Sequence, residues 1–496
     1  MSGDERTYVL GGEFRKRSLF TGVSGRQVAL LGAFVVVWVL ALIATRSLVV
    51  LVLGVVVILA GVGISRRRTQ LGDSWMGAVG DRAAFTAGNR GGAPDYVPGQ
   101  SLPREVGEVR MLAYAPPSAP QAPMAIIHHR DHKRRAWASG HLTVCFEIQG
   151  AGDGLLPVRQ TNTAGLLFER LLGGLASAEI PVDQLDIATR VLPVHPAAYQ
   201  EHMSGLVVPG TPERLRQSMD ELASYAAGNA EEYRSFATLR IPLPHLRAAA
   251  AMGPMDLEAV CEETFGLVGE VVRRVDTAGY RLRTVLGPKR LAALIRHMHD
   301  PDHPLDSLDG IDTLSDGFNF LRYRGRDSVR IEGTVRDWFH AVAHIPRDAW
   351  PADTIGARWM ENLVTQVSPA TIRTVVSQFR LVPKVRARQI ARIGLTYDTA
   401  SSRSAKKKSQ ISTGETEASM TAARRTLNDL MRPVVSGVYP AVRVMVSAPD
   451  SRQLLAARKL VTGSAESGGV TRLGWETYGH HKAMATCLPL ARGVKA

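Results

Sequence analysis

Cysteine is scarce in this sequence. The 496 residues include three, Cys145, Cys261 and Cys487, and these lie far apart. A disulfide framework or a cysteine-based zinc site needs an even set or closely spaced pairs. The pattern excludes both and predicts reduced thiols, as in a cytoplasmic compartment.

Three common catalytic patterns are missing as well. The chain has no Gly-x4-Gly-Lys-Ser/Thr loop, whose backbone N–H groups and lysine bind nucleotide phosphates. The nearest approach, Gly287-Pro288-Lys289, lacks the upstream glycine, and its proline has no N–H. Neither a Gly-x-Ser-x-Gly turn nor a His-Glu-x-x-His helix occurs. We therefore expect a non-enzyme and assign no catalytic, cofactor-binding or metal-binding residue and no cofactor.

Apolar residues are plentiful, and at one end they are continuous. The chain is 45% hydrophobic, which excludes wholesale disorder, and its mean hydropathy of −0.03 excludes a transporter with many spans. Residues 28–45 and 48–65 are two runs without a charge, separated by Arg46-Ser47. Each run spans about 27 Å as a helix, enough for a bilayer core. A transmembrane helical hairpin is predicted at 27–65; a buried hairpin in a soluble core is the alternative.

Basic residues flank this hairpin on both outer sides. Residues 1–70 hold nine Lys and Arg against three Asp and Glu, which accounts for a large share of the net charge of +14. The positive-inside rule then places both termini in the cytoplasm, with the chain in the plasma membrane. No charge lies inside either run, so the hairpin reads as an anchor or assembly surface rather than an ion pathway.

The rest of the chain alternates strand and helix patterns, which predicts a mixed α/β (α+β) protein with two or three cytoplasmic domains. Strand alternation is clearest over 142–148, 186–192, 233–241 and 442–446, and helical spacing over 167–175, 291–298 and 354–366. No internal repeat of fixed period is visible. The expected segments are a basic start (1–26), the hairpin (27–65), a juxtamembrane linker (66–107), two α/β domains (108–250 and 251–398) and a helical segment with a closing α/β unit (399–496).

Histidines and carboxylates gather after the helix expected to start at Pro288. Such groups could converge on a metal, but a helix C-terminus also favours histidine near its negative end. We favour the second interpretation here, and a basic turn between strands for the histidines near 130. The candidates are His297, His299, Asp300, Asp302 and His303, then His128, His129 and His132, then His480 and His481.

Two basic segments, Arg130–Arg135 and Arg403–Lys408, could touch nucleic acid. Aromatic residues make up 6% of the chain and do not interleave with either segment, as single-strand stacking would require. Contacts to acidic lipid or protein are the favoured interpretation.

The order of elements resembles parts of bacterial conjugation (type IV secretion) machines. Thr7-Tyr8, Gly11-Gly12 and Gly25-Arg26-Gln27 before a two-helix hairpin resemble a PrgI-like membrane subunit. The later stretches 327–345 and 399–431, Ala441–Ser447 with the following Asp450-Ser451-Arg452-Gln453-Leu454, and the end from His480 to Leu490 resemble the amino-terminal, non-ATPase half of the large conjugation ATPase. Taken as a whole, the chain resembles a family of actinobacterial conjugative-element integral membrane proteins.

The resemblance implies a membrane-anchored scaffold that docks a separate ATPase and other subunits in a hetero-oligomeric complex. One alternative is the membrane component of a type VII secretion system. Another, of a different class, is a membrane-tethered, metal-dependent enzyme that uses Asp300, Asp302 and His303. A DNA-handling adaptor is a further alternative.

Overall fold

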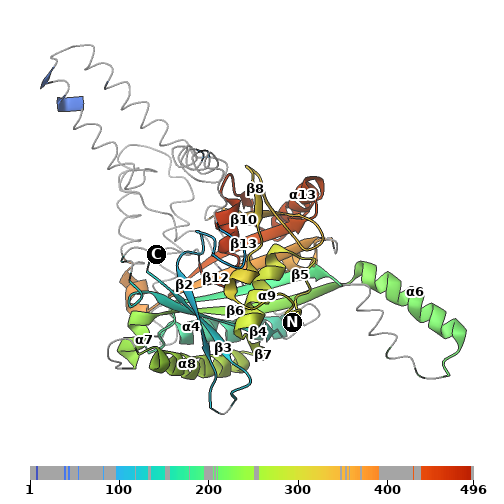
Figure 1. Ribbon diagram of the computed structural model, residues 1–496, viewed down its shortest axis with the longest axis horizontal. Coiled ribbons are helices and arrows are strands. Elements are labelled where there is room, and N and C mark those ends of the chain that lie inside the picture. Colours follow the sequence, from blue (N-terminus) through green and yellow to red (C-terminus); the bar gives the residue numbers. More distant parts are fainter. Residues whose placement is uncertain are drawn as a thin grey trace.

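The computed structural model describes residues 96–389 with short gaps, residues 437–492, and isolated residues elsewhere. The expected membrane hairpin at 27–65 and the segment Arg403–Lys408 lie outside the described residues. Among the helices that are described, none combines the length and the apolar character needed to cross a bilayer. The described chain is mixed α/β and is built around one large antiparallel sheet (Figure 1).

Twelve strands of the described chain form this sheet, and every neighbouring pair is antiparallel. The order is β2-β3-β4-β6-β5-β12-β13-β10-β9-β8, with β7 on β4 and β14 on β10. The strands are β2 (Val109–Tyr114), β3 (Met124–His129), β4 (His141–Gln149), β5 (Gln184–Pro193), β6 (Glu231–Pro242), β7 (Arg281–Val285), β8 (Leu321–Arg324), β9 (Val329–Ile331), β10 (Trp338–His344), β12 (Ile372–Val382), β13 (Gly437–Ala448) and β14 (Gly474–Trp475). A separate pair joins β1 (Thr7–Tyr8) to β11 (Ile355–Gly356).

The first half of the sheet is a ferredoxin-like unit. Its chain order is β4, α4 (Val158–Leu175), β5, β6, α8 (Leu257–Thr277) and β7. Its strand order in the sheet is β7-β4-β6-β5. A βαββαβ chain with this order is the split βαβ arrangement, in which both helices cover the same face.

The second half repeats this topology. Its chain order is β10, α10 (Glu361–Thr365), β12, β13, α13 (Ser451–Ser467) and β14, and its strand order is β14-β10-β13-β12. The first helix is reduced to a single turn, yet Leu363 from it still packs with Leu454 and Val461 of α13. The described chain is therefore a tandem of two ferredoxin-like units.

The two units meet through equivalent edge strands. β5 and β12 pair antiparallel, from Val191 opposite Arg373 to Gln184 opposite Arg380. Phe379 and Leu381 pack into the first unit's core, and Val375, on the same face of β12, packs into the second unit's core. The helices of both units therefore cover the same face of the sheet. An approximate two-fold axis between β5 and β12 relates the two units.

The other face of the sheet carries different covering elements. α9 (Pro288–His299), the 3-10 turn η2 (Leu314–Gly317) and α14 (His480–Ala485) pack there on Cys145, Phe236, Val342, Val376 and Met445. We call this the α9 face. Pro288 starts α9, where its missing N–H costs no helical bond.

Two connections depart from a minimal ferredoxin-like unit. Residues 194–230 join β5 to β6 and contain α6 (Glu213–Asn229), which projects away from the sheet (Figure 1). Residues 383–436 join β12 to β13, the equivalent connection of the second unit. α7 (Leu243–Ala249) follows β6 and places Leu243 and Leu246 in the first core.

Most of the strand and helix predictions hold within a few residues, but two are wrong. The helix expected over 354–366 is instead β11, a turn and the short α10, because Ile355 pairs in a strand with Tyr8. The sequence also predicts a last strand over Thr471–Leu473, but the strand lies at Gly474–Trp475, and these two residues pair with His344 and Ala343.

Candidate functional site

The C-terminal end of α9 and the loop after it cover a row of buried polar side chains on the α9 face. Arg190 on β5 lies opposite Arg234 on β6 and Thr374 on β12. His340 on β10 continues the row toward the other edge of the sheet and lies opposite Ser447. These side chains come from both ferredoxin-like units, so the shared sheet brings them together.

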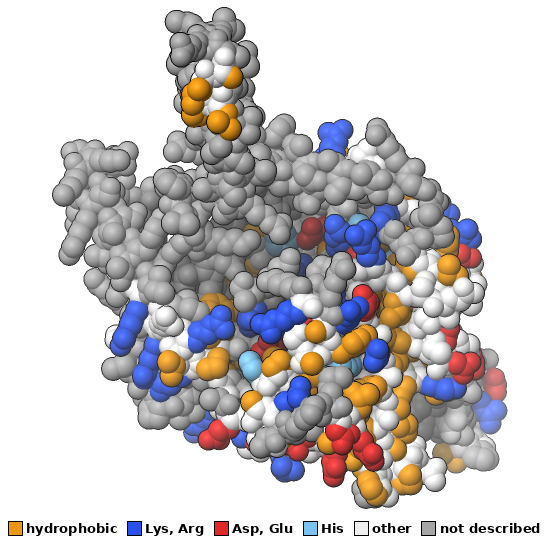
Figure 2. Space-filling view, turned by 60° about the vertical axis from the view of Figure 1, so that its left-hand side comes forward, with side chains coloured by type: hydrophobic (Ala, Val, Ile, Leu, Met, Phe, Trp, Pro, Cys, Tyr) orange, Lys and Arg blue, Asp and Glu red, His pale blue; other side chains and the backbone are white. Residues whose placement is uncertain are grey.

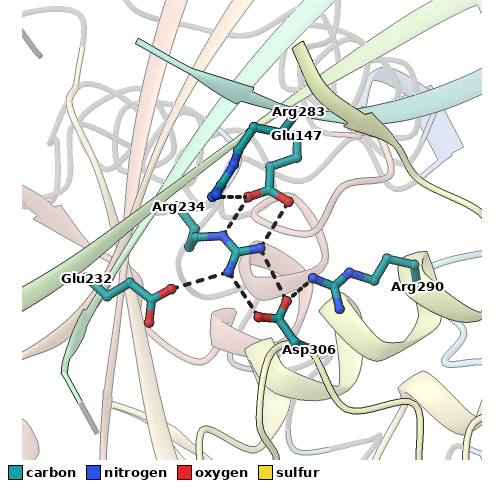
Figure 3. A network of polar contacts seen from close by, with 6 residues as sticks. All are labelled: Glu147, Glu232, Arg234, Arg283, Arg290 and Asp306. Atoms are coloured by element: carbon teal, nitrogen blue, oxygen red, sulfur yellow. Dashed lines mark hydrogen bonds and ion pairs between the residues drawn. The ribbon is translucent and has the colours of Figure 1, made fainter. Parts of the chain in front are cut away.

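Arg234 is the centre of a network of ion pairs at one end of this row (Figure 3). Its Nε and Nη2 donate to the two carboxylate oxygens of Glu147 at 2.6 and 3.0 Å, and its Nη1 donates to Glu232 at 3.2 Å. Asp306, in the loop after α9, accepts from both Nη atoms of Arg234 at 3.3 Å and also pairs with Arg290. Arg283 adds a bond to Glu147, so the six residues drawn balance three cations against three carboxylates.

A second buried arginine, Arg373, lies on the opposite face of the sheet and is equally well paired. Its side chain is fully buried, and Nη1 and Nη2 donate to the two oxygens of Glu231 at 2.8 and 3.2 Å. Backbone carbonyls of Leu363, Val364 and Thr371 accept from the remaining N–H groups. Glu231 belongs to the first unit and Arg373 to the second, so this pair links the two.

Arg190 is different. It is fully buried, and its Nη1 donates to Thr374 Oγ1 at 2.9 Å. Its Nε and Nη2 have no hydrogen-bond partner in the structure, and no described carboxylate forms an ion pair with it. Burial lowers the pKa of Arg190 to about 9. A buried cation without a counter-ion is costly, which marks Arg190 as the least satisfied group of the row.

Histidines next to Arg190 are buried and neutral. His297 donates from Nδ1 to the carbonyl of His303 at 2.7 Å, and His340 bonds Ser447 Oγ and the carbonyl of His299, both at 2.9 Å. The pKa values of His297, His299 and His340 are lowered to about 3, chiefly by burial, and the charge of Arg190 contributes to the lowering at His297 and His340. The side-chain nitrogens His297 Nε2 and His303 Nε2 are buried without a partner.

The carboxylates of the predicted α9 cluster do not join these histidines. Asp300 accepts from Thr334 N and Oγ1, both at 2.6 Å, and from Asp302 N at 3.2 Å. Asp302 accepts from Arg336 Nε and Trp338 Nε1, both at 3.1 Å. Both carboxylates therefore tie the loop to the strand region after β9, and their oxygens are committed to N–H and O–H donors.

The other histidine candidates also have structural partners. On β3, His128 bonds the carbonyl of Trp137 at 3.0 Å, and His129 stacks on His141 with ring centroids 4.3 Å apart. His132 lies outside the described residues. His480 accepts from Val342 N at 3.0 Å, and His481 pairs with Glu105 at 3.1 Å. Within the part of the chain that is described, no group of three metal-ligating side chains is placed to hold a metal.

The residues that matter most on this face were missed by the sequence patterns. Glu147, Arg190 and Arg234 each lie at a buried position in a strand that also carries buried apolar residues. A charged residue inside a buried strand could have indicated these positions from the sequence, because a buried charge needs a partner. The predicted cluster at 297–303 does lie beside Arg190, but it serves as the cover of the site.

On the described surface, α6 is a projecting helix with an apolar face. α6 exposes Leu215 at 56% and Leu222 at 62%, with Met219 between them at helical spacing. Elsewhere, Figure 2 shows Lys and Arg side chains lying among acidic and hydrophobic ones rather than in one stripe.

No protein-family model and no curated protein matches this chain. The fold therefore defines it: a tandem ferredoxin-like α/β protein with one shared antiparallel sheet.

Proposed function

We propose that the chain is a non-catalytic, membrane-anchored scaffold of a conjugation-type (type IV) secretion apparatus, with its bulk in the cytoplasm. The proposal rests on the uncharged runs 28–45 and 48–65, on the resemblance of the order of elements, and on one structural observation, the projecting helix α6. The docked partner is a protein, the separate ATPase subunit of the apparatus.

The apolar face of α6 supports this proposal. Isolated exposed leucines are ordinary, but Leu215, Met219 and Leu222 share one helix face on an arm that leaves the body of the protein. An amphipathic helix that lays such a face into a partner's groove is a common recognition mode. The charged groups on the α9 face, by contrast, hold the fold together and do not form a nucleophile–base pair.

The test is affinity purification of the full chain from detergent-solubilised membranes after mild crosslinking, with mass spectrometry of the captured proteins. We expect a conjugation-type ATPase with the unchanged chain. Leu215→Ser with Leu222→Ser should reduce its recovery at least about tenfold, since two buried leucines contribute several kcal/mol. Leu455→Ser, at a leucine of α13 that is 52% exposed, is the matched control and should leave recovery unchanged.

The alternatives predict other outcomes of the same experiment. Capture of type VII secretion components in place of the ATPase would establish the second class of apparatus. Capture of no membrane partner would contradict both secretion proposals. Equal recovery of the ATPase with the α6 variant and with the Leu455 control would contradict the docking role of α6, while the proposal of a scaffold would stand.

A further inference from the structure

The edge of Arg190 that lacks a partner is the edge with which arginine binds two oxygens at once. Nε–H and Nη2–H point in the same direction and form a fork. The neighbouring Arg234 shows this use in the same sheet: its Nε and Nη2 hold both oxygens of Glu147. Arg190 has the same two atoms buried and unpartnered.

The charge balance around Arg190 calls for an anion. The Figure 3 network pairs three carboxylates with three arginines and is neutral by itself. Arg190, on the strand beside Arg234, adds a positive charge that no described carboxylate offsets. Arg373 and Arg234 each have a carboxylate partner that offers two oxygens, so Arg190 is the exception among the buried arginines of the described residues.

Other buried polar groups lie near Arg190 or near its neighbour His297. Thr374 Oγ1 holds Nη1 of Arg190 and so orients the fork. His297 lies close enough for the charge of Arg190 to lower its pKa, and His297 Nε2 and His303 Nε2 are buried nitrogens without a partner. The loop after α9 reaches the surface at Pro304 and Asp306.

We propose that Arg190 is the centre of a binding site for a small oxyanion, with Thr374 orienting its guanidinium and His297 near it. The ligand class is a phosphate or carboxylate group that offers two oxygens to Nε and Nη2. The site lies where the second unit's β12 and the cover from α9 meet the first unit's β5. Binding there would tie the two units and the α9 loop together, independently of the docking role of α6.

The test is thermal unfolding of the full chain in mild detergent, titrated with inorganic phosphate or acetate against potassium chloride at matched ionic strength. A ligand that binds the folded state raises the melting temperature with saturation. We expect a saturable rise in melting temperature for the unchanged chain. The anion that produces it, phosphate or acetate, identifies the ligand class. Arg190→Gln should weaken the apparent affinity at least about tenfold, and Arg190→Lys should weaken it too, because lysine keeps the charge but lacks the fork.

Two further readings separate a binding role from a purely structural one. Without oxyanion, Arg190→Gln should melt at or above the temperature of the unchanged chain, since it removes an unpaired buried charge. Arg452→Gln, at an exposed arginine of α13, should leave the oxyanion response intact. Absence of a saturable response to both anions in the unchanged chain would overturn the proposal, whether or not the variants fold. An equal response in Arg190→Gln would overturn it as well.

Discussion

Charged side chains buried in the middle of this sheet are stabilised by different kinds of partner. Arg234 and Arg373 have carboxylates that bind two of their nitrogens, whereas Asp186 has amide donors only. Asp186 accepts from Gln184 at 2.8 Å and from Gln378 at 3.2 Å, and it is fully enclosed on the α9 face. Burial raises the pKa of Asp186 to about 7, above the ordinary value of 3.8.

The raised pKa predicts a pH-dependent stability at this residue. A carboxyl group whose pKa is higher in the folded than in the unfolded state binds its proton more tightly when the protein is folded. Its contribution to the free energy of unfolding is fully present below the unfolded pKa and is lost as pH rises from about 4 to about 7. Each unit of pKa difference corresponds to about 1.4 kcal/mol. Asp186→Asn should therefore melt at a higher temperature than the unchanged chain at pH 8, with the difference shrinking toward pH 4.

Melting curves across this pH range check the prediction. Asp309→Asn, at an exposed aspartate, is the control and should leave the pH profile unchanged. A lower melting temperature for Asp186→Asn at pH 8 would show that the charged form is the favoured one in the folded protein.

At the scale of elements, local sequence signals set where helices begin. Asp256 caps α8: its side chain accepts from Glu258 N at 3.0 Å and Ala259 N at 3.4 Å. These N–H groups have no partner within the helix. Asp450 does the same for α13 through Gln453 N at 2.8 Å. Each unit thus starts its second helix with an aspartate cap.

Removal of the aspartate cap of α8 should lower the free energy of unfolding. Asp256→Ala leaves the two N–H groups without the side-chain acceptor and should lower the free energy of unfolding by about 1 kcal/mol. Asp256→Asn keeps an acceptor oxygen and should stay close to the unchanged chain. Denaturant unfolding of the three proteins checks this, and equal losses in both variants would point to the charge at the helix start rather than to the cap.

At the scale of the whole molecule, the two ferredoxin-like units share one sheet and are tied by polar contacts between them. Arg373 pairs with Glu231 across the boundary, and Arg358 donates to Thr161 at 2.9 Å. β5 and β12 pair with each other, so neither unit has an unpaired strand edge where the two units meet. We expect the described part of the chain to unfold as one cooperative body.

The Glu231–Arg373 pair gives a test of this coupling. Glu231→Gln leaves a buried arginine without its counter-ion and should cost about 3 kcal/mol. Glu232→Gln, at the next and more exposed residue, should cost much less. Hydrogen exchange should show β4 and β10 losing protection together in Glu231→Gln; loss confined to one of them would mean that the units unfold separately.

The mixed α/β class and most of the strands and helices follow from local patterns in the sequence. Period-two alternation in residues 142–148 and 442–446 predicted β4 and β13, and Pro288 with the apolar spacing after it predicted α9. These signals are local, because side-chain periodicity and helix starts depend on neighbours within a few residues. The membrane hairpin, the secretion role and the segment boundaries at 250 and 398 remain predictions.

The tandem repeat and the site around Arg190 became visible in the folded chain and not before. The repeat is invisible in the sequence because topology constrains the order and pairing of strands and not which apolar residues fill them. The first helix of the second unit, α10, is a single turn, which hides the correspondence further. Arg190 and Thr374 are brought together by strand pairing between distant segments, and His297 comes near them through the packing of α9 on the sheet; neither contact leaves a local pattern.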